Sequence, residues 1–256
     1  MKLHALTLAC LAAFTGVANA TEPDACLVNR DLIYSESPLP HVAAALQQKN
    51  LTISVVGSAS STLPGSSGAK MAYPAQLNSA LARQLPDVPV KVISHARSKW
   101  SAAEMVGEFA NILSQDKPSL IIWQTGTVDA MRGIDPAEFQ NTLDSGVSML
   151  HEKGVDVILM NMQFSPRTET MIAASAYADD LRWVAMQQDI PLFDRFAVMK
   201  QWSELGTFDL YSADKSSATA ERVHDCLGRL LAEMIIDTAK RDQATPNDRP
   251  QPKDKS

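Results

Sequence analysis

Short apolar segments rich in β-branched residues alternate along the chain with longer segments that have helical periodicity. Apolar runs of this length and composition predict β-strands. The predicted strands are residues 51–56, 88–93, 120–124, 155–161 and 191–193. The predicted helices are residues 73–85, 101–113, 136–152, 171–188 and 219–240.

The order of these elements predicts an α/β fold. Asp135 is a good helix cap, and Pro136 follows it at a favoured first helical position, which supports one of the helix starts. Strands that alternate with helices in this rhythm form a three-layer α/β/α sandwich around a mainly parallel sheet, here five-stranded, with right-handed crossovers. Large apolar residues at helical spacing predict core packing at Trp183, Met186, Met199 and Trp202.

The first twenty residues have the pattern of a secretory signal. Lys2 precedes an apolar run at residues 6–17, and residues 18–20 read Ala-Asn-Ala, a small-residue cleavage site. We expect cleavage after Ala20; a lipid anchor at Cys10 is the alternative. No later run approaches the roughly 18 apolar residues of a membrane span. We therefore expect a periplasmic or secreted protein without membrane insertion.

The rest of the chain predicts one domain at residues 21–242, which begins with an irregular arm at residues 21–37. Residues 243–256 contain three prolines and no core-forming residue, so we expect a disordered tail. No internal repeat is present. We expect a monomer.

Charge and cysteine content narrow the function further. Lys and Arg number 23 against 29 Asp and Glu, a net charge of −6, and no basic stripe is present, which argues against nucleic acid as a partner. Cys26 and Cys226 lie near opposite ends of the mature chain, in a compartment where disulfides persist. We expect them to form a disulfide; two unpaired thiols are the alternative.

Polar residues follow two of the predicted strands, where the working residues of open α/β sheets collect. After the first strand, residues 57–65 read Gly-Ser-Ala-Ser-Ser-Thr-Leu-Pro-Gly, a turn that can present a hydroxyl. The strand at 120–124 ends in Gln124 and leads into Thr125-Gly126-Thr127-Val128-Asp129.

A histidine near the far end of the chain has an acid three residues before it. Glu221 and His224 open the last predicted helix, and a carboxylate that holds one imidazole nitrogen while the other faces a hydroxyl is the arrangement of a catalytic triad. A surface or capping histidine is the alternative for His224.

Taken in order, these three sites resemble the SGNH/GDSL hydrolases. In that family the serine follows the first strand, a Gly-x-Asn-Asp block follows a central strand, and Asp-x-x-His lies close to the C-terminus. The chain is most similar to a bacterial branch with a Gly-Ser-Ser-Ser-Thr-type loop and a Trp-Gln-x-Gly-Thr-x-Asp-Ala block, which stands here at residues 123–130. The resemblance covers nearly the whole mature chain and implies serine ester hydrolysis without a cofactor.

The nucleophile loop departs from the family pattern. Strict register from Gly57 places Ala59 at the nucleophile position, whereas one inserted residue places Ser60 there. We choose Ser60; Ser58 and Ser61 are the alternatives.

The oxyanion site departs too, since the family's asparagine falls on Val128 and the glycine expected after the second strand is not evident in residues 94–98. Loss of one oxyanion donor typically lowers turnover by about 10² to 10³. Substitute donors could come from Gln124, Thr127, Arg97 and the backbone amides of the nucleophile loop. The resemblance implies oxyanion or substrate contacts at Gly57, Gln124, Gly126, Thr127 and Asp129.

The predicted function is ester hydrolysis, with Ser60 as nucleophile, His224 as base and Glu221 as the acid that orients it. If Glu221 points into solvent, Asp209 or Asp214 could take its place as the acid. The substrate is a small ester or an O-acyl group on an envelope glycan. The alternative is a catalytically impaired member that binds a glycan or a partner protein.

Other chemistries find little support in the sequence. His41, His95 and His151 lie on no metal-ligand spacing, so we expect no metal site. No phosphate-binding loop is present. Arg167 and Glu169 follow the fourth predicted strand and could line a substrate mouth, although a solvated loop is the simpler interpretation.

Overall fold

A parallel sheet forms the centre of the protein, whose computed structural model describes residues 24–170, 174–211 and 217–243. The strand order is β2-β1-β3-β4-β5, and every neighbouring pair is parallel. The strands are β1 (Leu51–Gly57), β2 (Val90–Ala96), β3 (Leu120–Gln124), β4 (Asp156–Met160) and β5 (Leu192–Phe193). All residues of β3 and β4 are buried, as expected for a parallel sheet covered on both faces.

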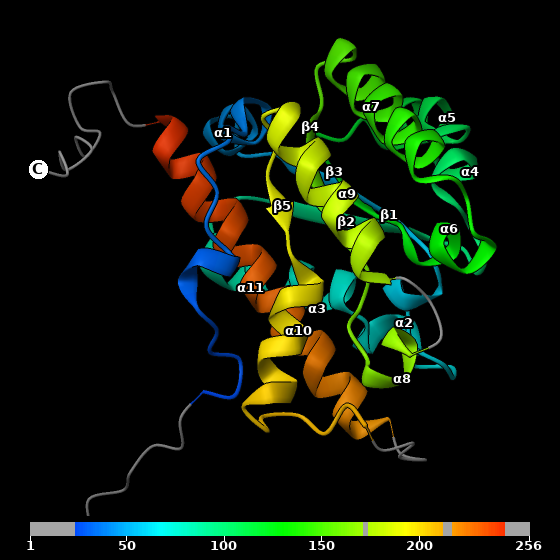
Figure 1. Cartoon of the computed structure of the whole chain (residues 1–256). Coiled ribbons are helices and arrows are strands. Elements are labelled where there is room, and N and C mark those ends of the chain that lie inside the picture. The colour runs from blue at the N-terminus through cyan, green and yellow to red at the C-terminus, as the bar shows by residue number, and fades with distance from the viewer. Residues whose placement is uncertain (1–23, 171–173, 212–216, 244–256) are drawn as a thin grey trace, which may run out of the picture.

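Helices cover both faces of the sheet (Figure 1). One layer contains α1 (Pro40–Gln47), α3 (Tyr73–Gln84) and α11 (Ala218–Gln243). The other contains α4 (Ala102–Val106), α5 (Phe109–Asp116), α7 (Pro136–Glu152) and α9 (Ala174–Gln187). This arrangement confirms the predicted three-layer sandwich. The remaining elements are η1 (Arg30–Leu32), η2 (Ala59–Ser61), α2 (Gly68–Met71), α6 (Thr127–Arg132), α8 (Pro166–Glu169) and α10 (Arg195–Glu204).

Most predicted elements are present with small shifts at their ends. The strand at 120–124 and the helix at 136–152 have the predicted bounds, whereas the predicted helix 101–113 divides into α4 and α5 around Gly107. Helices α1, α6 and α10 lie outside the predicted helices. The start of the predicted helix at 171–188 lies partly outside the described residues.

Two of the four predicted core positions are wrong. Trp183 and Met186 are 47% and 67% exposed, because α9 turns other residues, including Leu181 and Val184, toward the sheet. Met199 and Trp202 of α10 are buried as predicted.

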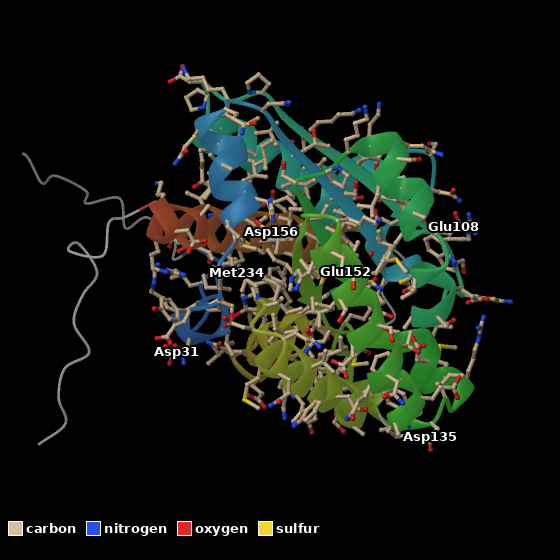
Figure 2. The ribbon with its side chains drawn as sticks, turned by 90° about the horizontal axis from the view of Figure 1, so that it is seen from above. Asp31, Glu108, Asp135, Glu152, Asp156 and Met234 are labelled. Carbon is tan, nitrogen blue, oxygen red and sulfur yellow. A yellow bond between two sulfur atoms is a disulfide. The ribbon has the colours of Figure 1, made fainter. Side chains whose placement is uncertain are left out.

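The N-terminal arm is tied to the last helix. A disulfide joins Cys26 to Cys226 across a sequence separation of 200, which confirms the predicted pairing, and Asp24 pairs with Arg229 beside it. Figure 2 shows Asp31 of the arm at the periphery, whereas Asp156 lies in the interior.

The predicted signal at residues 1–20 and residues 244–256 of the predicted tail lie outside the described residues. Among the helices of the described segments, none has both the length and the apolar character needed to cross a bilayer.

Candidate active site

A cavity of about 660 Å³ lies where the polar residues that follow β1 and β3 meet the last helix. Its walls come from the β1–α2 connection, the β2–α4 connection, α6, the residue Gln163 after β4 and the start of α11. The lining residues are Ser58, Ala59, Ser60, Thr62, Leu63, Ser98, Lys99, Thr127, Val128, Met131, Arg132, Gln163, Ala220 and His224. The two ends of the chain therefore meet at the carboxyl edge of the sheet, where such folds place their sites.

Gln124, the last residue of β3, organises the nucleophile loop. Its Oε1 accepts hydrogen bonds from the Ser58 backbone N–H at 3.3 Å, from Ser60 Oγ at 3.1 Å and from Ser61 Oγ at 2.8 Å. Because a backbone N–H can only donate, the orientation of the amide is determined, and Gln124 Nε2 is left buried with no partner within residues 24–170, 174–211 and 217–243. A Cβ at Gly57 would lie 2.1 Å from Ser61 Oγ, so only glycine fits beneath this loop.

The three candidate hydroxyls occupy different environments. Ser58 and Ser60 line the cavity. Ser61 does not line it, and its Oγ lies 3.0 Å from the hydroxyl of Tyr73; Ser58 and Ser61 are both buried, whereas Ser60 is partly exposed. Burial raises the pKa of Tyr73 to about 12, so this phenol stays protonated. Ser58 and Ser60 are therefore the two candidate serines at the cavity wall.

Arg195, the first residue of α10, lies behind the loop. It is fully buried; its Nη1 donates to Ser60 O at 3.2 Å and to Ser60 Oγ at 3.3 Å, and its Nη2 donates to Gln163 Oε1 at 3.2 Å. Burial lowers the pKa of Arg195 to about 10, so it is charged at neutral pH. Arg195 and Gln163 were missed in the sequence, although both follow predicted strands.

His224 is buried and uses one ring nitrogen to cap a helix. Its Nδ1 accepts a hydrogen bond of 2.9 Å from the backbone N–H of Tyr73, at the start of α3. In a neutral imidazole this assigns the ring proton to Nε2. Burial, and then the charge of Arg195, lower the pKa of His224 to about 3. Among the described residues no hydrogen bond joins the ring to Ser58, Ser60 or Ser61.

Glu221 lies away from the His224 ring. Its Oε1 accepts a hydrogen bond from Ser217 Oγ, and its side chain lines a different cavity, beside Asp225. Asp209 lines a small cavity of about 220 Å³ that includes His224, and Asp214 lies outside the described residues. The structure thus brings Ser60 and His224 to one cavity and places Glu221 outside it.

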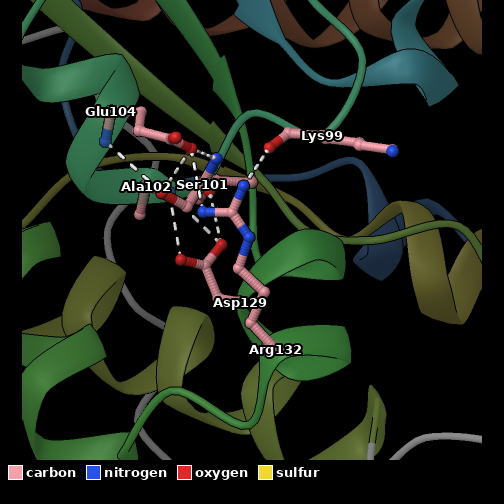
Figure 3. Close-up of polar contacts among 7 residues, drawn as sticks. Lys99, Ser101, Ala102, Glu104, Asp129 and Arg132 are labelled. Atoms are coloured by element: carbon pink, nitrogen blue, oxygen red, sulfur yellow. Dashed lines mark hydrogen bonds and ion pairs between the residues drawn. The ribbon is translucent and has the colours of Figure 1, made fainter.

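The block that follows β3 has both structural and cavity-facing residues. The Asp129 carboxylate accepts hydrogen bonds of 3.0 and 3.3 Å from the backbone N–H of Ala102, and so joins α6 to the start of α4 (Figure 3). Burial raises the pKa of Asp129. Val128 lines the cavity with an apolar side chain. Thr127 also lines the cavity, but its Oγ1 is buried and has no hydrogen-bond partner in the described part of the chain.

Gly126 needs its backbone freedom, since its φ is +96° and a Cβ there would lie 2.7 Å from Met162 Cε.

Arg97 does not line the cavity; its guanidinium stacks on Trp100 at 4.5 Å. Glu169 is exposed. Within the described segments, no group of three or more His, Cys, Asp or Glu residues is arranged to hold a metal ion.

Comparison with known proteins gives one family and several structural relatives. The model of the Non-GDSL lipase-like family matches residues 25–241. Esterase TesA of Pseudomonas aeruginosa is 28% identical over 76 residues, which span 30% of this chain and 38% of that esterase.

Solved structures share the fold across most of the chain. A crystal structure of TesA has a TM-score of 0.55 at 23% identity and covers 74% of this chain and 98% of its own. A catalytic mutant of Axe2, an acetylxylan esterase from Geobacillus stearothermophilus, has a TM-score of 0.59 at 17% identity and covers 72% of this chain and 94% of its own.

Proposed function

Because the chain belongs to the Non-GDSL lipase-like family, we propose that it hydrolyses esters in the cavity at the carboxyl edge of its sheet. The observation that carries this proposal is that the hydroxyl of Ser60 and the imidazole of His224, from opposite ends of the chain, line one cavity. A hydroxyl and a base in one site are the minimum equipment of serine hydrolysis.

In the proposed reaction, Ser60 Oγ bonds to the carbonyl carbon of the ester and passes its proton to Nε2 of His224. The imidazolium then returns the proton to the oxygen of the leaving alcohol, and water releases the acyl group by the same sequence. For Nε2 to accept a proton, Nδ1 must carry one, so the hydrogen bond from Tyr73 N–H is broken in the reactive state. Glu221 orients the ring only if it leaves Ser217.

Two donors near the loop are suited to the oxyanion. Gln124 Nε2 and Thr127 Oγ1 are buried and find no partner among the residues that the structure describes, and both belong to the segment that supplies the oxyanion asparagine in similar hydrolases. The side chain of Val128 has no donor to offer. We assign oxyanion contacts to Gln124 and Thr127, and a structural role to Asp129, whose carboxylate holds the Ala102 amide.

The proposed substrate is a small ester or an O-acyl group on an envelope glycan. Two features support a site of action outside the cytoplasm: the signal-like sequence at residues 1–20 and the disulfide between Cys26 and Cys226, a bond that persists in oxidising compartments. One relative of the same fold acts on acetylated xylan, which fits an O-acyl glycan. We propose that the protein acts as a monomer in the periplasm or after secretion.

A fluorophosphonate probe tests the nucleophile. We expect the purified protein to be labelled and to hydrolyse p-nitrophenyl acetate, and both activities to be lost in Ser60→Ala. Ser58→Ala is the matched control, because Ser58 also lines the cavity and precedes the same short helix. Loss of labelling in Ser58→Ala but not in Ser60→Ala would move the nucleophile to Ser58, and labelling that survives both substitutions would refute the mechanism.

A second function, binding without hydrolysis, is favoured by one specific observation. A catalytic triad needs a histidine nitrogen that is free to accept the proton of the serine. In His224 this nitrogen is Nε2, which carries the ring proton as long as Nδ1 accepts the N–H of Tyr73. Burial also makes the ring a weak base. Under this alternative the cavity retains a glycan or ester without cleaving it. Absence of fluorophosphonate labelling, together with equal ligand affinity in the wild type and Ser60→Ala, would support binding over hydrolysis.

A further inference from the structure

Arg195 contacts the candidate nucleophile without lining the main cavity. Its Nη1 donates to the backbone oxygen of Ser60 at 3.2 Å and to Ser60 Oγ at 3.3 Å, and its Nη2 donates to Gln163 Oε1 at 3.2 Å. Arg195 is fully buried and is not among the residues that surround the cavity of about 660 Å³. A guanidinium in this place acts on the serine oxygen and not on a ligand in that cavity.

The charge of Arg195 is not neutralised by a carboxylate. In the described segments no ion pair joins its guanidinium to an Asp or Glu, and its Nε has no hydrogen-bond partner there. The carboxylate of Asp194, next in the chain, accepts instead from Arg182 Nε at 2.6 Å and from Asn161 Nδ2 at 2.7 Å. Asp209 lines a small cavity that Arg195 also lines, but no ion pair joins these two described residues. A buried charge is little screened by solvent, so Ser60 is exposed to most of its field.

Two other groups are affected by the same charge. The guanidinium carbon lies 5.7 Å from the centre of the Tyr73 ring, which is a cation–π distance. The charge is also the second cause, after burial, of the lowered pKa of His224. Among the described residues, however, Arg195 forms no hydrogen bond with either ring. Of these groups only Ser60 Oγ is in hydrogen-bond contact with the cation, so the charge acts most strongly on the serine.

This contact distinguishes Ser60 from the two serines beside it. Ser61 Oγ is bonded to neutral groups, Gln124 Oε1 at 2.8 Å and the Tyr73 hydroxyl at 3.0 Å. Ser58 contacts Gln124 through its backbone N–H. Of the three candidate hydroxyls, Ser60 alone has a cation hydrogen-bonded to its oxygen within the part of the chain that the structure describes. The electrostatic environment therefore selects the same serine that sequence register left open.

We propose that Arg195 is a catalytic residue that activates Ser60, because its charge stabilises the serine oxygen as the hydroxyl proton leaves. This inference rests on the proposed ester hydrolysis and adds a group to it. The O–H bond of Ser60 breaks and the proton passes to Nε2 of His224, while the electron pair left on Oγ forms the bond to the carbonyl carbon. The bond from that carbon to the leaving oxygen then breaks, and the leaving oxygen takes the proton back from the imidazolium.

Steady-state hydrolysis of p-nitrophenyl acetate by the full mature protein tests this role. Arg195→Met should lower kcat by at least about 100-fold, as loss of one charge-stabilising donor does, and should change KM by less than about twofold. KM is spared because Arg195 touches the serine and not the ester. Arg195→Lys retains the charge, so its kcat should exceed that of Arg195→Met by at least about tenfold. The matched control is Lys200→Met, which removes an exposed positive charge from the same helix and should behave as the wild type.

The pH dependence separates the charge of Arg195 from its packing. Burial lowers the pKa of Arg195 only to about 10, so the wild type keeps this charge up to pH 9. A buried lysine amine loses its proton at lower pH than a guanidinium. The rate of fluorophosphonate labelling of Arg195→Lys should therefore fall relative to the wild type as pH rises from 7 to 9. A purely structural role would lower the rate by the same factor at every pH.

The two possible failures are distinct. If the wild type shows no hydrolysis that depends on Ser60, the proposed function is refuted and this inference falls with it. If the wild type hydrolyses the ester and Arg195→Met does so with an unchanged kcat, only the role of Arg195 is refuted. A raised KM at unchanged kcat would also overturn it. If Arg195→Met does not fold, Arg195→Lys decides the question, and a pH profile equal to that of the wild type would refute activation by the charge.

Discussion

The hydrogen bond between His224 and the start of α3 makes a sharp prediction about stability. The acceptor Nδ1 lies 2.9 Å from the Tyr73 backbone nitrogen, and both residues are buried. In His224→Ala this N–H has no protein partner, which should cost about 1–3 kcal/mol in addition to the lost packing of the ring. In His224→Asn the side-chain oxygen can replace Nδ1, so we expect most of the hydrogen-bond loss to be recovered.

The pH dependence of stability in the same variants tests the burial of His224 independently. The folded-state pKa of His224 is lowered to about 3, below its ordinary value of 6.5, so its contribution is fully present above pH 6.5 and is lost as pH falls toward 3. With these two values the wild type should lose about 2 kcal/mol between pH 8 and pH 5 through this residue. His224→Asn should not show that loss.

Urea denaturation at pH 8 and pH 5 measures both effects, with the wild type, His224→Asn and His224→Ala unfolded in parallel. The quantity of interest is the difference between the wild type and His224→Asn, because other titrating groups cancel in it. We expect His224→Asn to gain about 2 kcal/mol relative to the wild type on acidification. A difference that does not change with pH would show that the imidazole is neither as buried nor as strongly coupled to Arg195 as the structure indicates.

Three further predictions concern the rest of the fold. Burial raises the pKa of Asp156 from 3.8 to about 6 while its Oδ2 accepts from Val42 N at 2.8 Å, so the wild type should lose about 3 kcal/mol as pH rises from 3.8 through 6. Asp156→Asn should therefore be more stable than the wild type at pH 8 and equal to it near pH 3.5; a less stable variant at pH 8 in urea unfolding would contradict this. Reduction of the disulfide between Cys26 and Cys226 should lower the unfolding free energy by about 5 kcal/mol in the chain-entropy model, a loss seen as a lower Tm in calorimetry with dithiothreitol. An unchanged Tm on reduction would argue against the bond in solution. Gly57→Ala should displace the nucleophile loop, because the new methyl would lie 2.1 Å from Ser61 Oγ, and labelling by the fluorophosphonate probe should fall at least about tenfold; full labelling would show that the loop adapts at little cost.

The alternation of strands and helices could be predicted from the sequence, because the spacing of apolar residues differs between a buried strand and a helix with one buried face. The strand at 120–124 and the helix at 136–152 have their predicted bounds, since both bury one continuous run or one stripe of side chains. Short helices such as α1 carry too few turns for a clear period. Trp183 was misjudged because spacing alone does not say which stripe of α9 meets the sheet.

Sequence order also predicted that the polar residues after β1 and β3 lie close together, because the carboxyl ends of parallel strands meet at one edge of the sheet. The loop after β1 and the block after β3 line or support the cavity as this rule requires. Arg195 follows β5 and obeys the same rule. It passed unnoticed because no motif in the chain contains it.

The sequence by itself determined the α/β class and the set of polar residues available at the edge of the sheet. Only the tertiary structure decided that His224 caps α3 and that Arg195 stands behind Ser60. The physical reason is one of scale. Burial patterns repeat along a segment and can be read locally, whereas a hydrogen bond between distant segments depends on placing two packed helices within a few tenths of an ångström.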